Sequence, residues 1–120
     1  MTANQFRRMA LSLPEVEERG HMGHPDFRVG GKIFATLGCP NKSWGMVKLT
    51  PEQQRIFLPA HPAVFVPASG SWGVKGCTLV RLKDADANTL QEAMKAAWLG
   101  RAPKAIIARS GTGGAYCQTD

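Results

Sequence analysis

The amino-acid sequence predicts an α+β fold of two layers, in which helices cover one face of an antiparallel sheet. Apolar residues recur with helical and strand periods in the order helix, four strands, helix, two strands, helix. A tight turn joins two consecutive strands, which makes those strands antiparallel neighbours. The helices bury their apolar sides against this sheet, and its other face is then open to solvent or covered by a partner.

A chain of 120 residues is enough for one domain. We assign residues 1–109 to that domain and residues 110–120, "SGTGGAYCQTD", to a flexible C-terminal tail. The 43% hydrophobic and 20% charged content is typical of soluble globular proteins. The sequence contains no run of about 18 apolar residues, which a membrane span would require. Its first residues lack the apolar segment of a signal peptide. We therefore expect a cytoplasmic protein with no membrane partner.

The first element is a helix, which begins at the capping-box pattern of Thr2 and Gln5 and ends before Pro14. Its apolar stripe at i, i+3, i+4 and i+7 consists of Phe6, Met9, Ala10 and Leu13. Four strands follow, at residues 16–21, 26–29, 32–37 and 44–49.

Gly30 and Gly31 have the spacing of a two-residue hairpin turn, because glycine tolerates the positive φ that such turns require. Counting outward from this turn predicts the cross-strand pairs Val29 with Lys32, Arg28 with Ile33, and Phe27 with Phe34.

A second helix begins at Thr50, with Pro51 in its first turn and Gln53 completing a capping box, and prolines 59 and 62 close it. Two strands, at residues 63–68 and 77–83, are joined by a glycine-rich loop that carries Trp72 and Lys75.

The last clear helix is capped by Asp86 and stops at Gly100. Its apolar face consists of Leu90, Met94, Ala97 and Trp98. The segment "APKAIIAR" adds a further helical turn or two.

Strand alternation separates a core face of the sheet from an outward face. The residues predicted to face the core are Val47, Leu49, Thr78, Val80 and Leu82. The residues predicted to face outward are Trp44, Met46, Lys48, Leu79, Arg81 and Lys83. Basic and aromatic side chains therefore share the outward side.

The segment "GHMGHPDFRVGGKIFATLG", residues 20–38, is favoured neither as a phosphate loop nor as a metal site. A Walker A loop would need glycine in place of Asp26 and Ser or Thr in place of Ile33. His21 and His24 would share a face only on a helix, which the neighbouring glycines and proline disfavour. We expect no metal and no cofactor.

The sequence also predicts no catalytic residues. It contains no G-x-S-x-G elbow and no spacing typical of a histidine, carboxylate and nucleophile set. Its three cysteines are an odd number and widely separated, which favours reduced thiols over disulfides or a zinc knuckle. We therefore expect a protein that is not an enzyme.

Three separated motifs, "GHPDFRVGGKIFATLG", "VKLTPEQQ" and "PASGSWGVKGCTLVRL", occur in this order along the chain. Together they resemble the MmcQ/YjbR family of small bacterial proteins over about residues 3–99. The resemblance implies a two-layer α+β fold related to those of the CyaY type and of secretion chaperones, and DNA binding by a "double wing". The chain departs from the family pattern at Cys77, where the family usually has Trp, and a cysteine offers no ring for stacking.

The net charge of +6 favours polyanionic partners. Our first hypothesis is a DNA-binding protein that contacts phosphates through basic strands and hairpin loops with weak sequence specificity. The candidate nucleic-acid-binding residues are Arg28, Lys32, Lys48, Trp72, Lys75, Arg81 and Lys83. The alternative is a non-enzymatic protein-interaction or regulatory module, in which outward Trp44, Met46 and Leu79 contact a protein partner or a second copy.

Overall fold

The structure, a computed structural model, describes residues 1–21, 24–38 and 41–110. Its sheet has the order β1-β2-β3-β4-β6-β5, and all neighbouring strands are antiparallel. The strands are β1 (Val16–His21), β2 (His24–Val29), β3 (Lys32–Leu37), β4 (Trp44–Lys48), β5 (Phe65–Pro67) and β6 (Cys77–Arg81). The helices are α1 (Ala3–Leu11), α2 (Pro51–Ala60), α3 (Gly70–Val74), α4 (Ala87–Arg101) and α5 (Lys104–Ser110).

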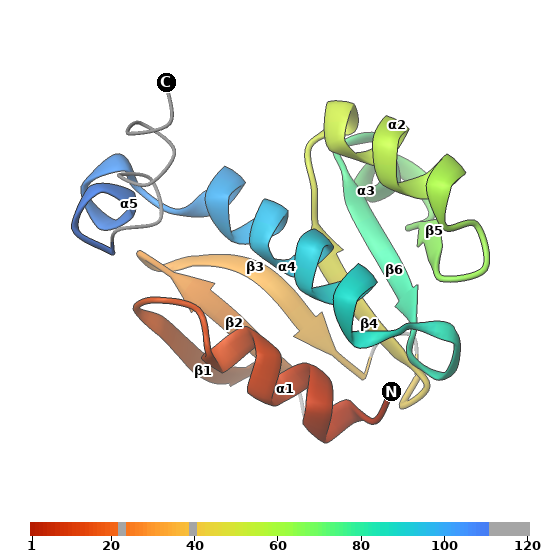
Figure 1. Ribbon diagram of the computed structural model, residues 1–120, viewed down its shortest axis with the longest axis horizontal. Helices are drawn as coiled ribbons and strands as arrows, with labels where there is room; N and C mark the ends of the chain where they lie inside the picture. The colour runs from red at the N-terminus through yellow and green to blue at the C-terminus, as the bar shows by residue number, and fades with distance from the viewer. Residues whose placement is uncertain (22–23, 39–40, 111–120) are drawn as a thin grey trace.

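Helices α1 and α4 lie on the same face of the sheet, so the predicted two-layer α+β fold is confirmed (Figure 1). We call this covered side the inner face and the opposite side the outer face. None of the helices in the described ranges is long and apolar enough to cross a membrane.

The helix starts follow the predicted capping. The hydroxyls of Thr2 and Thr50 accept hydrogen bonds from the backbone N–H of Gln5 and Gln53, at 3.1 Å in both helices. Asp86 accepts a hydrogen bond of 2.7 Å from the backbone of Thr89 at the start of α4. Each cap satisfies a backbone N–H that the first helical turn leaves without a partner.

Two predicted helix ends agree with the structure to within one residue. Pro59 lies inside the last turn of α2, and α2 continues to Ala60. Gly100 lies inside α4, which continues to Arg101. A proline in the last turn removes a single backbone donor, and a glycine costs only about 1 kcal/mol in a helix. Both local signals lie one residue before the observed helix end, where their cost is small.

The β2–β3 turn has the predicted glycine conformation, with φ of 59° at Gly30 and 80° at Gly31. Both pairs next to the turn are confirmed, but Phe27 pairs with Ala35 and not with Phe34. The register shifts by one residue between Phe27 and Arg28, which is a β-bulge. Because of this extra residue, the consecutive side chains of Phe34 and Ala35 are both fully buried, which strict alternation does not allow.

The predicted glycine-rich loop between β5 and β6 was wrong, because residues 70–74 form helix α3. The segment is too short and too rich in glycine to have a recognisable helical period. The last predicted strand is also shorter than expected, since Leu82–Asp84 form a 3₁₀ turn that carries Lys83. Residues 111–120 of the predicted tail lie outside the described residues.

The predicted alternation is confirmed on β4 and β6. The residues predicted to face the core, Val47, Leu49, Thr78, Val80 and Leu82, are all buried. Trp44, Met46, Lys48, Leu79 and Arg81 retain partial exposure on the outer face. The fold therefore leaves the aromatic and basic side chains of these two strands on the uncovered side of the sheet.

We predict that Gly30→Asn destabilises the protein, although Asn-Gly is the preferred sequence for a turn with two positive φ values. A Cβ at Gly30 would lie 2.5 Å from Cγ of Pro103. The overlap should lower the free energy of unfolding by about 1–3 kcal/mol, measured by urea denaturation.

The control for this prediction is the same substitution in a Pro103→Ala background. The alanine removes the overlapping ring atoms, so Gly30→Asn should then cost less than it does in the parent. A higher denaturation midpoint for Gly30→Asn alone would contradict the contact between Pro103 and the turn.

Candidate functional site

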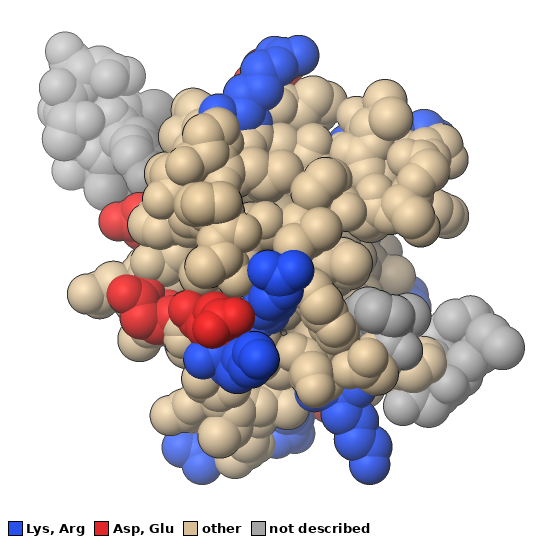
Figure 2. Space-filling view, turned by 90° about the vertical axis from the view of Figure 1, so that its right-hand side faces the viewer, with Lys and Arg blue, Asp and Glu red and all other residues tan. Residues whose placement is uncertain are grey.

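Basic side chains are dispersed on the surface that Figure 2 shows. This view looks onto the end of the sheet that carries α2 and β5, and there the Lys and Arg groups form separate spots, the central ones beside Asp and Glu groups. The net charge of +6 is therefore not gathered into one continuous patch on this side. The net charge therefore does not by itself mark a binding site on this side.

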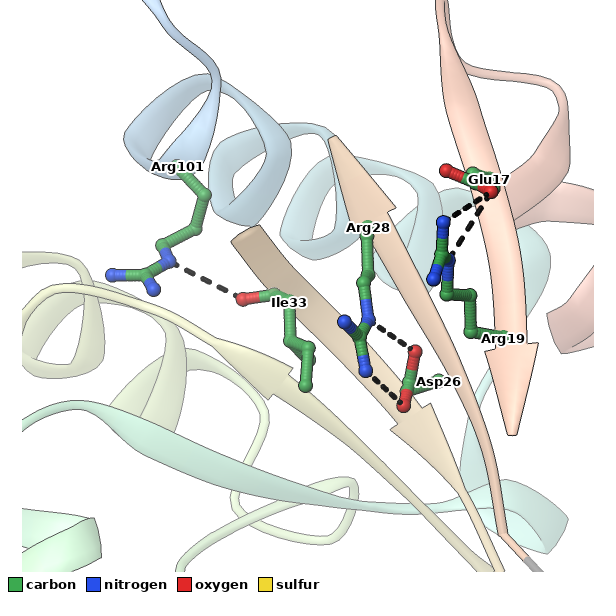
Figure 3. Close-up of polar contacts among 6 residues, drawn as sticks. All are labelled: Glu17, Arg19, Asp26, Arg28, Ile33 and Arg101. Atoms are coloured by element: carbon green, nitrogen blue, oxygen red, sulfur yellow. Dashed lines mark hydrogen bonds and ion pairs between the residues drawn. The ribbon is translucent and has the colours of Figure 1, made fainter. Parts of the chain in front are cut away.

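The half of the outer face formed by β1 and β2 carries charges of both signs (Figure 3). Arg28 donates from Nε and Nη2 to the two carboxylate oxygens of Asp26, at 2.9 and 3.2 Å. The hydrogen bond to Asp26 raises the pKa of Arg28 above its ordinary value. Arg19 forms a 3.1 Å ion pair with Glu17. The basic groups of this half thus have acidic partners on the same surface.

The other half of the outer face contains a groove of about 590 Å³ over β3, β4 and β6. Its floor on the strands consists of Ile33, Thr36, Met46, Cys77 and Leu79. Its wall, from β5 to α3, consists of Pro67, Ala68, Ser69 and Trp72. Lys48 is the charged residue of the groove, and among the described residues no acidic side chain lines it.

A basic and an aromatic side chain meet at each end of the β4–β6 pair. The ammonium of Lys48 lies 5.8 Å from the ring centroid of Trp72, and the guanidinium of Arg81 lies 5.3 Å from that of Trp44. Both distances are within the range of cation–π attraction. Since β4 rises about 3.3 Å per residue, the two ends are roughly 13 Å apart.

Further basic residues stand beside each pair. Lys75 and Arg101 line a hollow of about 310 Å³ that Lys48 and Trp72 also line. At the other end, Lys83 shares a hollow of about 240 Å³ with Trp44, Arg81 and Ser43. The groove is therefore an apolar surface with positive charge at its Lys48 end, and a separate basic hollow lies at the other end of the β4–β6 pair.

The position of Trp72 depends on the close approach of α3 to the end of β5. A Cβ on Gly73 would lie 1.9 Å from the carbonyl oxygen of Ala68, so a larger residue cannot occupy this position without a shift of the backbone. The same helix leaves the Trp72 side chain 62% exposed at the rim of the groove. Gly73 thus fixes the wall that carries the exposed ring.

Of the seven residues predicted from the sequence, the structure brings five to the two ends of the β4–β6 pair. Lys48, Trp72 and Lys75 lie together at one end, and Arg81 and Lys83 lie together at the other. Arg28 is held by Asp26, and Lys32 lies in the exposed β2–β3 hairpin.

Sequence reasoning missed Arg101, which joins the Lys48 end of the groove. Its Nε donates to the carbonyl oxygen of Ile33 at 3.2 Å, across 68 positions of the chain. The residue follows the glycine that was expected to end α4, and no sequence signal relates it to β3. The position of Arg101 beside β3 is a consequence of where α4 ends in the tertiary structure.

The histidines of the N-terminal hairpin lie in extended strands, where His21 and His24 are backbone partners of β1 and β2. Among the described residues, no group of three His, Cys, Asp or Glu side chains could hold a metal ion.

These features define a small two-layer α+β protein with an apolar groove on the uncovered face of its sheet and basic side chains at both ends of the β4–β6 pair. The chain belongs to the YjbR family, whose model matches residues 11–99. The fold is similar to that of the Deinococcus radiodurans protein DR2400, whose crystal structure contains a domain that matches the DUF419 family model. The two share 21% identity with a TM-score of 0.73, over 92% of this chain and 88% of that chain. No curated protein matches the chain.

We predict that Gly73→Ala lowers the free energy of unfolding by about 1–3 kcal/mol, because its Cβ overlaps the Ala68 carbonyl. Helix propensity alone would favour alanine over glycine by about 1 kcal/mol, so the two effects have opposite signs. Thermal denaturation measures the change, and tryptophan fluorescence reports displacement of the Trp72 ring.

Ser71→Ala is the matched control, since Ser71 is exposed on the same helix. It should change the unfolding free energy by no more than about 0.5 kcal/mol. A Gly73→Ala protein as stable as the parent, with the same fluorescence, would show that α3 does not depend on this approach.

Proposed function

We propose that this YjbR-family protein is a non-enzymatic DNA-binding module that contacts phosphates through the outer face of its sheet. The observation that carries the proposal is the pair of basic and aromatic groups at the two ends of the β4–β6 pair, beside a groove that no described acidic side chain lines. Positive charge beside exposed rings is typical of nucleic-acid-binding surfaces.

The proposed phosphate contacts come from two groups of residues. Lys48, Lys75 and Arg101 act at one end of the β4–β6 pair, and Arg81 and Lys83 act at the other. Lysine and arginine contacts to phosphate position a protein on the backbone but do not read bases. Sequence preference should therefore be weak, with affinity in the nonspecific range of about 10⁻⁴ to 10⁻⁶ M.

A second candidate function is binding of a protein partner or of a second copy of this chain. The apolar floor of the groove supports it, because Met46 and Leu79 keep partial exposure beside Trp72. In this case the basic residues would form the rim of an interface and contribute little to its affinity.

We predict that the double variant Lys75→Gln and Lys83→Gln weakens DNA binding to a similar extent for all sequences. On duplex DNA, each lost phosphate contact should reduce the slope of log K against log salt by about 0.9, so the double variant should lose about 1.8. Fluorescence anisotropy of labelled DNA over a series of salt concentrations measures both the affinity and the slope.

The control is Arg8→Gln with Lys104→Gln, which removes the same charge from exposed positions on α1 and α5. This variant should keep most of the parental slope. If both double variants behave alike, the binding reflects net charge and not this site. If the parent binds no DNA even at low salt, the proposal is wrong.

A further inference from the structure

We infer that the nucleic acid this groove accepts is a single strand, whose bases lie on the apolar floor and stack on Trp72 while its phosphates contact the basic ends. The inference rests on the proposed function and specifies its ligand. Four features of the outer face support a single strand over a duplex.

The first feature is the exposure of the Trp72 ring. Trp72 is 62% exposed at the rim of an apolar groove. An exposed ring offers a stacking surface to any base, because every base has a π-face. In a duplex the base faces are already stacked on one another, so a duplex cannot use this surface without being opened.

The second feature is the composition of the groove floor. Ile33, Met46 and Leu79 provide apolar contact area, and Thr36 and Ser69, which carry hydroxyls, are also lining residues. Apolar area suits the faces of unstacked bases. A hydroxyl can donate to or accept from any base edge, so it contributes hydrogen bonds without imposing a sequence.

The third feature is the spacing of charge along the groove. Lys48 at one end of the β4–β6 pair and Arg81 at the other lie about 13 Å apart along the strands, with Met46 and Leu79 of the groove floor between them. A single strand that runs along the groove would place phosphates at both ends and bases in between. Among the described residues, no acidic side chain lines the groove or the two basic hollows, which matches a polyanion.

The fourth feature disfavours a duplex laid across the whole outer face. Such a duplex would extend over β1 and β2, where the Glu17 side chain is 62% exposed and Asp26 holds Arg28. Phosphates there would meet carboxylates of the protein. A single strand that stays within the groove avoids this half of the face.

The experiment compares the binding of a labelled oligothymidylate with that of a DNA duplex of equal length at the same low salt. We expect the parent to bind the single strand at least about tenfold more tightly than the duplex. Trp72→Ala should weaken single-strand binding by about 5- to 150-fold, the equivalent of one lost base stack. Trp72→Phe should restore much of that affinity, because phenylalanine keeps an aromatic face.

Ile56→Ala is the matched control, since Ile56 is another large exposed apolar residue, on α2, that does not line the groove. It should leave single-strand binding unchanged. Met46→Glu provides a second variant that keeps Trp72 intact, and a carboxylate on the groove floor should reduce single-strand binding more than duplex binding.

The outcomes distinguish this inference from the proposed function. Duplex binding as tight as single-strand binding, with no difference between Trp72→Ala and Ile56→Ala, would overturn the inference and leave the proposed function standing. Absence of binding to either probe would overturn both. A parent that elutes as a dimer in gel filtration, and as a monomer after Met46→Glu, would also overturn the inference, because a second copy would then occupy the groove.

Discussion

Helix α4 packs on β3 and β4 with Leu90, Ala93, Met94, Ala97 and Trp98 all buried, and the rest of the structure depends on this contact. The indole N–H of Trp98 donates to the carbonyl oxygen of Pro14 at 3.0 Å, which links α4 to the chain just before β1. Helix α1 completes the layer, with the fully buried Phe6 ring lying so close to Gly45 that a Cβ there would approach it to 2.7 Å. The inner face is therefore closed by its own helices, and the outer face is the side of the sheet on which a ligand can bind.

The two halves of the outer face differ because the strands that form them differ in composition. On β1 and β2 the outward positions alternate between acid and base, and these side chains pair with one another. On β3, β4 and β6 the outward positions are largely apolar between basic ends. The bulge at Phe27 and Arg28 separates the two patterns, since it leaves Arg28 opposite Ile33 and buries both residues that follow Ile33.

The contact between Lys48 and Trp72 is weak enough for a nucleic acid to replace it. A cation–π contact at an exposed site contributes about 0.5–1 kcal/mol, so Lys48 holds Trp72 only weakly. A base stacked on the same ring is worth about 1–3 kcal/mol. The released ammonium would then be free for a phosphate, with which it forms a charge-assisted hydrogen bond. By contrast, Arg28 would have to leave two hydrogen bonds to a buried carboxylate, which makes it a poor phosphate ligand.

Local sequence patterns determined those parts of the protein whose physics is local. The capping boxes at Thr2 and Thr50 and the positive φ at Gly30 and Gly31 depend on neighbouring residues, and so all could be predicted. Alternation along β4 and β6 likewise predicted that Lys48 and Arg81 face outward.

Only the tertiary structure decided the features that depend on contacts between distant segments. The bulge that places Ala35 opposite Phe27, the end of α4 that brings Arg101 to Ile33, and the short helix that carries Trp72 to the groove are of this kind. Each of these features depends on the surfaces that the sheet and its helices bury against one another. That choice minimises the free energy of the whole domain, and a few tenths of a kcal/mol of local preference cannot override it.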